Sequence, residues 1–216
     1  MERFFILDKF NTWYDWRSYL TSKDVTPPEP KTNYIELDGM NGTLDLSESL
    51  TGEITYKDRT ITATFWTSEG SYAERERLLQ RITGSLHGKK IKIIEPDDPD
   101  HYFYGRVKIK SRKNILPYAE YTIEANCEPW RYAIDETVRK INMFGTTDIV
   151  IHNNGVKTLS PVVTTSNSMS VTFDGNTIQL PTGSYVMSDL RLRTGANVIR
   201  VTGYGNLTFT YREADL

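Results

Sequence analysis

The stretch Ser71–Gly88, "SYAERERLLQRITGSLHG", carries the clearest secondary-structure signal in the chain. Ser71 and Glu74 form a capping-box pattern, in which the serine side chain caps the first turn and the glutamate reaches back to the serine amide. Apolar residues follow at helical spacing: Leu78, Leu79, Ile82 and Leu86. His87 closes the last turn, and Gly88 suits the C-terminal cap. We therefore predict one amphipathic helix here.

The segments on both sides of this helix alternate apolar and polar residues, as strands with one buried face do. Before the helix, Ile61, Ala63 and Phe65 alternate with threonines. After it, Val107 and Ile109 alternate with basic residues, and Tyr121–Cys127 alternates in the same way. Strand, helix, strand and strand in this order predict an α+β unit with its helix on an antiparallel sheet.

Residues 141–216 differ in composition from those before them, with only five acids, five bases and no tryptophan. Apolar residues alternate along Met169–Phe173 up to Asp174-Gly175, a dipeptide that favours a tight hairpin turn. The segments 196–201 and 207–211 are predicted as two further strands. We predict a mainly β chain with an N-terminal domain of residues 1–140. Residues 141–216 would form a C-terminal β-sandwich or jelly roll.

The composition narrows the class of protein. With 216 residues, 38% hydrophobic and 25% charged, the chain suits a globular protein. A net charge of −2 makes no electrostatic case for a nucleic-acid or anionic-membrane partner. The single cysteine, Cys127, forms no internal disulfide. The start "MERFFILDKF" has too short an apolar run for a signal peptide, and no run approaches the ~20 residues of a membrane span. We expect the protein to be made and assembled in a cytoplasm.

The loop "ELDGMNGTLDL" (Glu36–Leu46) contains residues that could hold a cation or a phosphate. A calcium loop starting at Asp38 would place Met40 and Gly42 where oxygen ligands are needed, so that spacing fails. A phosphate loop fails because no Gly-Lys-Ser/Thr is present and a strand pattern follows. We predict a glycine-permitted turn between strands.

A second candidate is "EPDDPDH" (Glu95–His101), where four side chains could coordinate a cation: Asp97, Asp98, Asp100 and His101. The segment lies between two strand patterns, and Asp and Pro are usual in exposed hairpin loops, so a loop is the favoured interpretation. The histidines, His87, His101 and His152, form no His-Glu-x-x-His motif. A Cys–His pair stays open, although Cys127 lies on the apolar face of its strand and is expected to pack. We predict no catalytic, cofactor-binding or metal-binding residue, and no enzyme.

Taken in order, several segments between about residues 10 and 133 resemble the distal tail protein (Dit) family of long-tailed bacteriophages. The segments are "WYDWRSYLTSKDVTPPEPKTNYIELDGMNGTLDLSESLTG", "ITYKDRTITATFW", "SLHGKKIKII", "YFYGRVKI" and "ANCEPWRY". No one of them is specific alone, and the ordered series carries the resemblance.

The resemblance implies a structural virion protein without an active site. Members of the family form a homo-hexameric ring at the distal end of the tail, a hub between the tail tube and the baseplate or tail tip. The N-terminal domain builds the ring, whose hole lets DNA pass. The C-terminal domain, a galectin-like jelly roll in the family, holds further tip proteins such as a fibre or lysin. The resemblance also implies that the turn in Glu36–Leu46 is the corner joining an early extended segment to the sheet of the ring-forming domain. The expected location is the phage tail tip, after assembly in the host cytoplasm, with no specific nucleic-acid binding.

Two alternatives remain open. A jelly roll also suits a carbohydrate-binding module for host-surface recognition. However, residues 141–216 lack tryptophan, and "IHNN" (Ile151–Asn154) is only part of a galectin sugar motif. A cell-wall hydrolase would need a carboxylate pair at a defined separation, which no pattern singles out.

Overall fold

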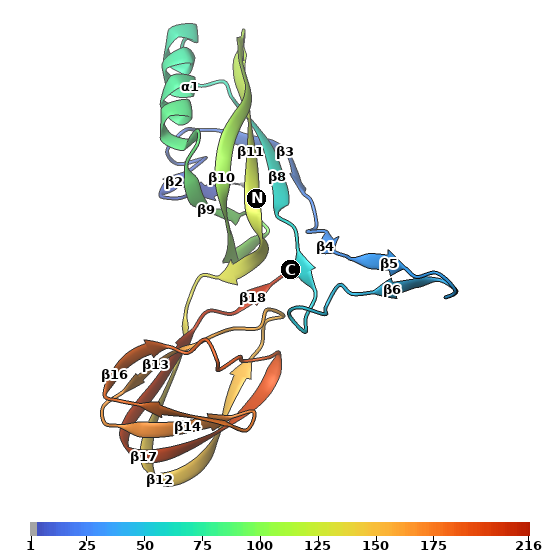
Figure 1. The fold of residues 1–216 in the computed structure, drawn as a ribbon. Helices are drawn as coiled ribbons and strands as arrows, with labels where there is room; N and C mark the ends of the chain where they lie inside the picture. The colour runs from blue at the N-terminus through green and yellow to red at the C-terminus, as the bar shows by residue number, and fades with distance from the viewer. Residues whose placement is uncertain (1–3) are drawn as a thin grey trace. The chain divides into compact units, whose positions relative to one another are not determined.

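The structure is a computed structural model that describes residues 4–216, which divide into two compact units (Figure 1). The first unit runs to Arg131 and the second covers Tyr132–Leu216. Met1–Arg3, part of the N-terminal stretch considered above as a leader, lie outside the described residues. Strands dominate both units, and the predicted mainly β fold is confirmed.

One antiparallel sheet forms the body of the first unit, with the strand order β2-β1-β9-β10-β11-β8-β3. Along the chain the bounds are β1 Ile6–Leu7, β2 Phe10–Asn11, β3 Tyr19–Val25, β8 Arg59–Thr67, β9 Lys90–Glu95, β10 Asp98–Ile115 and β11 Tyr118–Ala133. The alternation predicted for β8 and β11 is present. Ile61, Ala63 and Phe65 are buried opposite Ala125, Ile123 and Tyr121.

Helix α1 (Tyr72–Leu86) covers the apolar face of this sheet and confirms the predicted amphipathic helix. Both halves of the capping box are present, because Ser71 Oγ accepts from the Glu74 amide and Glu74 accepts from the Ser71 amide. Its buried leucines and isoleucine share one core with β8, β9, β10 and β11. His87 is the cap residue, and Gly88 follows with a φ of +79°.

Residues 30–56 leave the sheet as an extension, which we call the arm. Its strands are β4 (Pro30–Lys31), β5 (Tyr34–Glu36), β6 (Thr43–Asp45) and β7 (Thr55–Tyr56). β4 pairs only with β7, and β5 only with β6. The turn predicted within Glu36–Leu46 is present, with Gly39 and Gly42 at φ of +85° and +82°. The predicted corner onto the sheet is wrong, because both flanking strands pair with each other and not with the body.

The second unit is a curled antiparallel sheet with the order β15-β14-β17-β13-β16, in which β12 pairs with the other edge of β17. The bounds are β12 Thr137–Asn153, β13 Val162–Thr165, β14 Met169–Phe173, β15 Asn176–Leu180, β16 Gly183–Val186 and β17 Gly195–Tyr211. The short strand β18 (Ala214–Asp215) lies outside this sheet. The predicted Asp174-Gly175 turn joins β14 to β15, with φ of 47° and 81°.

Three glycines bend the long β12–β17 ladder in its middle. Gly145 is the partner of Gly203, and Gly205 is the partner of Met143. On one side of the bend β17 pairs with β14, through Arg200–Thr202, and on the other with β13, through 207–210. A bend at glycines allows one long strand to be part of two facing halves of the sheet. Both halves contribute side chains to one core, including Val163, Val171, Val201 and Phe209.

One sequence prediction needs adjustment here. The segments 196–201 and 207–211, predicted as separate strands, are parts of the single strand β17. The compact units meet at residues 131 and 132, whereas the compositional boundary at 140 and 141 lies inside β12. The change in amino-acid composition comes later in the chain than the boundary between the compact units, because the exposed start of β12 still carries Arg139 and Lys140.

Candidate oligomerisation surfaces

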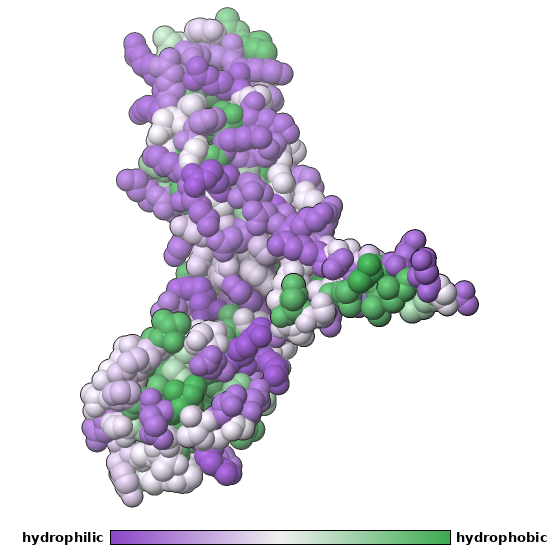
Figure 2. All heavy atoms as spheres, in the orientation of Figure 1, coloured by the Kyte–Doolittle hydropathy of each residue, from purple (hydrophilic) through white to green (hydrophobic). Residues whose placement is uncertain are grey.

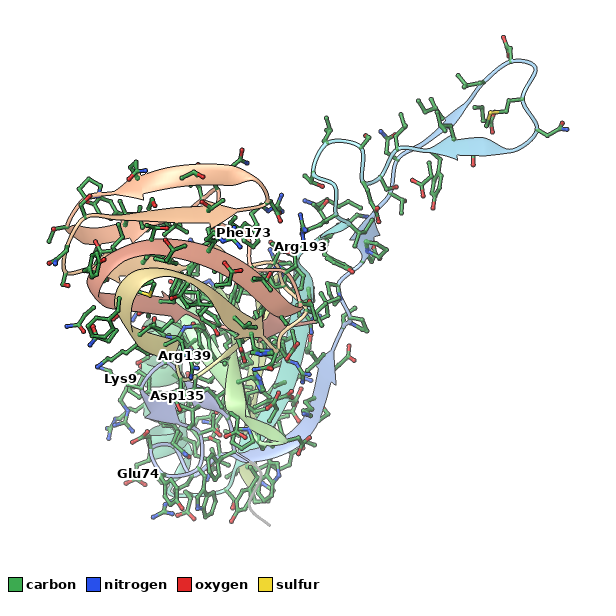
Figure 3. All side chains as sticks on the ribbon, turned by 90° about the horizontal axis from the view of Figure 1, so that it is seen from below. Lys9, Glu74, Asp135, Arg139, Phe173 and Arg193 are labelled. Atoms are coloured by element: carbon green, nitrogen blue, oxygen red, sulfur yellow. The ribbon has the colours of Figure 1, made fainter. Side chains whose placement is uncertain are left out.

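The outer part of the arm presents apolar side chains to solvent. Ile35 lies directly opposite Leu44, and Leu37 follows on the same face because side chains alternate along a strand. Their exposed fractions are 41%, 39% and 48%, and Met40 at the turn is 44% exposed. Figure 2 shows these apolar residues gathered along the arm, and Figure 3 shows its side chains standing clear of the first unit's sheet.

The arm lacks the support that a hairpin of this size needs. Every residue from 29 to 45 is exposed, and β5 and β6 have three residues each. An isolated two-stranded hairpin is at best marginally stable in water. Its base is tied to the body by the Tyr56 ring, which meets Trp130 edge-on at 5.6 Å. An exposed apolar hairpin of this kind is typical of a segment that becomes buried against a partner.

A second exposed surface of the first unit is a row of aromatic rings, which we call the aromatic row. It runs from Trp13 through Tyr19 and Trp66 to Tyr118. Successive ring centroids are 4.6, 4.9 and 6.5 Å apart. The Arg17 guanidinium lies over Trp13 at 5.2 Å from the ring centroid. Trp, Tyr and Arg are the residues most enriched at the energetic centres of protein interfaces.

The aromatic row lies at a free edge of the sheet. β3 is the last strand in the order, and Tyr19 pairs across it with Trp66 of β8. A recess of about 330 Å³ opens there, lined by Thr21, Trp66, Tyr118 and Glu120. Tyr19 and Trp66 stack on each other, whereas Trp13 and Tyr118 meet these rings at steep angles, so a partner would meet ring edges, ring faces and the strand edge. An unprotected strand edge favours pairing with another chain.

Basic side chains on the sheet's polar face are largely neutralised by acids. Lys108 and Lys110 contact Glu124 at 2.5 and 2.8 Å, and Lys90 contacts Glu128 at 2.7 Å. These pairs are exposed, so each contributes little to stability. They neutralise three of the basic side chains that a nucleic-acid surface would use.

The candidate cation loop at Glu95–His101 forms a tighter turn than predicted. Only Pro96 and Asp97 connect β9 to β10, and the residues from Asp98 onward belong to β10. The predicted loop is therefore too long, because Pro99 lies in a bulge of β10 between Asp98 and Phe103 and the strand continues past it.

The acids of this turn have cationic or imidazole partners. Asp98 contacts His101 Nδ1 at 2.8 Å and Arg131 at 3.0 Å. Lys23 contacts Glu95 and, at 2.8 Å, Asp97. Within residues 4–216, no three His, Cys, Asp or Glu side chains come together in an arrangement that could hold a metal.

Three further residues are candidates for chemistry: Cys127, His87 and His152. Cys127 is fully buried, and burial raises the pKa of its thiol to about 12, so the nucleophilic thiolate is absent at neutral pH. His87 Nδ1 accepts from the Ile109 amide at 3.1 Å. His152 is exposed on β12 of the other unit. Sequence patterns missed the aromatic row, because its members come from three separate segments of the chain.

No helix in the described part of the chain combines the length and the apolar character needed to span a bilayer.

The sequence matches no family model and no curated protein. The fold is similar to the crystal structure of SPP1 Dit (gp 19.1), described as a paradigm of the hub adsorption apparatus in phages that infect Gram-positive bacteria. The TM-score is 0.71 at 14% sequence identity, and the alignment covers 99% of each chain. The resemblance predicted from the sequence is thus confirmed at the level of the fold. Over nearly its whole length, this chain has the fold of the SPP1 Dit protein.

Proposed function

We propose that this chain is a structural component of a bacteriophage tail. It forms a homo-hexameric ring at the distal end of a long tail and joins the tail tube to the tip or baseplate. Two findings support the proposal: the whole-length likeness to the SPP1 Dit hub protein, and two unlike exposed surfaces on the first unit. The chain works by assembly rather than by catalysis, and it is located in the virion after assembly in the host cytoplasm.

The observation that carries the proposal is the exposed arm. A closed ring needs a heterologous contact, in which two different surfaces of each subunit meet. The arm and the aromatic row are two such surfaces, both apolar in part. The arm carries five acids and one base over residues 30–56, and the aromatic row carries Arg17. We propose that the arm of one copy packs on the aromatic row of the next.

The two units take different roles in this proposal. The first unit builds the ring and meets the tail tube, and the second holds further tip proteins such as a fibre or lysin. The ring leaves a channel for DNA. Its lining is not strongly basic, since a basic lining would hold the polyanion. The Glu124 and Glu128 ion pairs support this. A map of the assembled ring with unpaired Lys and Arg around the hole would contradict it.

Light scattering and negative-stain microscopy test the ring. We expect the full chain to have about six times the monomer mass and to form rings. Leu44→Asn, on the apolar face of the arm, is expected to give monomers. Thr43→Asn introduces the same side chain on the opposite face of the same strand and is expected to assemble normally. Circular dichroism checks that both variants fold.

A strictly monomeric wild-type chain at high concentration, with no rings on the grid, would overturn the proposal. Cross-linking then tests which surfaces meet. Leu44→Cys with Thr21→Cys places one reactive thiol on the arm and one beside the aromatic row. A bismaleimide is expected to join neighbouring copies into a ladder up to the hexamer. Each single variant is the control, because a lone arm cysteine would join at most chance pairs.

A further inference from the structure

A pocket of about 410 Å³ lies on the second unit where the two ends of β12 come close together. Thr137 and Arg139 line it from the start of the strand, and Val150 and His152 line it from the end. The curl of the sheet brings these ends together. The Tyr211 hydroxyl, beside Thr137 in the ladder, donates to the His152 carbonyl oxygen at 2.5 Å. This volume falls in the range of small-molecule sites.

The pocket offers hydrogen-bonding groups that have no other use in the described residues. Arg139, labelled in Figure 3, is exposed, and its guanidinium makes no hydrogen bond or ion pair within residues 4–216. The His152 ring is likewise exposed without a side-chain partner there. Together they supply a planar fork of donors and a ring that both donates and accepts.

Neighbouring residues hold the pocket in shape. Asn154 lines it, and its amide and side-chain nitrogens both donate to Glu213 Oε1, at 3.1 and 3.0 Å. Asn153 is fully buried, and its side chain donates to the Lys157 and Leu192 carbonyls at 2.8 and 3.1 Å. These contacts fix the Asn154 side chain and the backbone at the end of β12, so this part of the pocket would lose little binding free energy to ordering.

We propose that this pocket binds a neutral pyranose sugar. A sugar hydroxyl both donates and accepts. The pocket matches this with Arg139 as donor, the Asn154 carboxamide oxygen as acceptor and His152 as either. Val150, 45% exposed, offers an apolar surface for the C–H face of the ring. A phosphate or a carboxylate would be repelled by the Glu213 carboxylate beside Asn154. Such an anion also needs hydrogen-bond donors only, whereas this pocket presents acceptors as well. The site goes beyond the structural role and would let the second unit contact a glycan surface.

Saturation-transfer NMR on the full chain tests the site, with D-glucose, D-galactose and N-acetyl-D-glucosamine as separate probes and inorganic phosphate as competitor. We expect signal transfer to at least one sugar, unaffected by phosphate. Arg139→Gln and His152→Ala are each expected to weaken binding about tenfold, the effect of losing one hydrogen bond to a charged or polar group. Lys140→Gln, the adjacent exposed residue outside this pocket, is the matched control and is expected to bind as wild type.

Three results would overturn the assignment. One is no transfer to any of the sugars at millimolar concentration. Another is binding that phosphate displaces, which would mark an anion site. The third is binding that survives both Arg139→Gln and His152→Ala, which would place the sugar elsewhere. Ring formation is measured separately, so failure here leaves the proposed hub role untouched.

Discussion

Gly203 of β17 lies against Met169, the first residue of β14. A Cβ atom added to Gly203 would lie 2.6 Å from Met169 Cγ and 3.2 Å from its Cα. The neighbouring Gly205 has the same relation to Ser166, at 2.5 Å from its Oγ. On the β17 side, the bend is therefore packed against Met169 and Ser166, and Gly203 has no room for a side chain.

Gly203→Ala is expected to destabilise the second unit by about 1–3 kcal/mol, the usual effect of forcing an extra carbon into a packed site. Urea unfolding followed by far-ultraviolet circular dichroism measures the change. All four tryptophans lie in the first unit, so tryptophan fluorescence follows that unit separately. The fluorescence midpoint should stay constant. An unchanged dichroism transition would mean that the bend tolerates a methyl group.

Gly84→Ala should have the opposite effect on the first unit. Gly84 is exposed within α1, and an added Cβ would have no neighbour within 4 Å. Alanine is favoured over glycine in a helix by about 0.5–1 kcal/mol because it restricts the unfolded chain. The tryptophan fluorescence midpoint in urea should rise. A lower urea midpoint would indicate that α1 contacts another molecule at Gly84, because no neighbour within the chain opposes the added methyl group.

The Cys127 thiol is expected to resist modification in the folded protein. Burial raises its pKa to about 12, against about 8.5 for a free cysteine, so at about pH 8 the native thiol stays neutral and shielded. The stabilisation from burying the neutral thiol is complete below about pH 8.5 and is lost as the pH rises through 12. Ellman's reagent should give no colour until urea is added. Thr43→Cys, on the exposed face of the arm opposite Leu44, provides the fast-reacting control.

Hydrogen exchange should distinguish the free arm from the assembled arm. In the monomeric Leu44→Asn variant, amides of β5 and β6 are expected to exchange rapidly, because a short exposed hairpin opens readily. In wild-type rings the same amides should exchange slowly, while β11 stays protected in both samples. Equal exchange rates of the arm amides in the two samples would show that the arm is not buried when the ring forms.

Local signals in the sequence predicted the local structure well. The capping box of Ser71 and Glu74 needs only neighbouring residues, and so does the Asp174-Gly175 turn, and both are present. The buried alternation of β8 and β11 also follows from sequence alone, since each strand keeps one face on the core.

Contacts between residues that are distant in the chain could not be predicted from these local patterns. The turn at Gly39 and Gly42 was predictable, but whether its strands would pack on the sheet depends on partners distant in the chain. The continuity of β17 was hidden by Gly203 and Gly205, which look like strand breakers and instead form a bend. The aromatic row and the pocket at Arg139 and His152 both arise from residues brought together only by the fold.

The β12–β17 ladder also sets the order in which the second unit can form. Asn153 and Gly195 are partners in the ladder, and β13, β14, β15 and β16 all lie in the chain between them. Pairing these two 17-residue strands therefore requires closing a long loop before the contacts compensate for the lost chain entropy. Such topologies fold slowly. The β14–β15 hairpin, closed by a two-residue turn, can form first, and the long ladder would close around it as the late step.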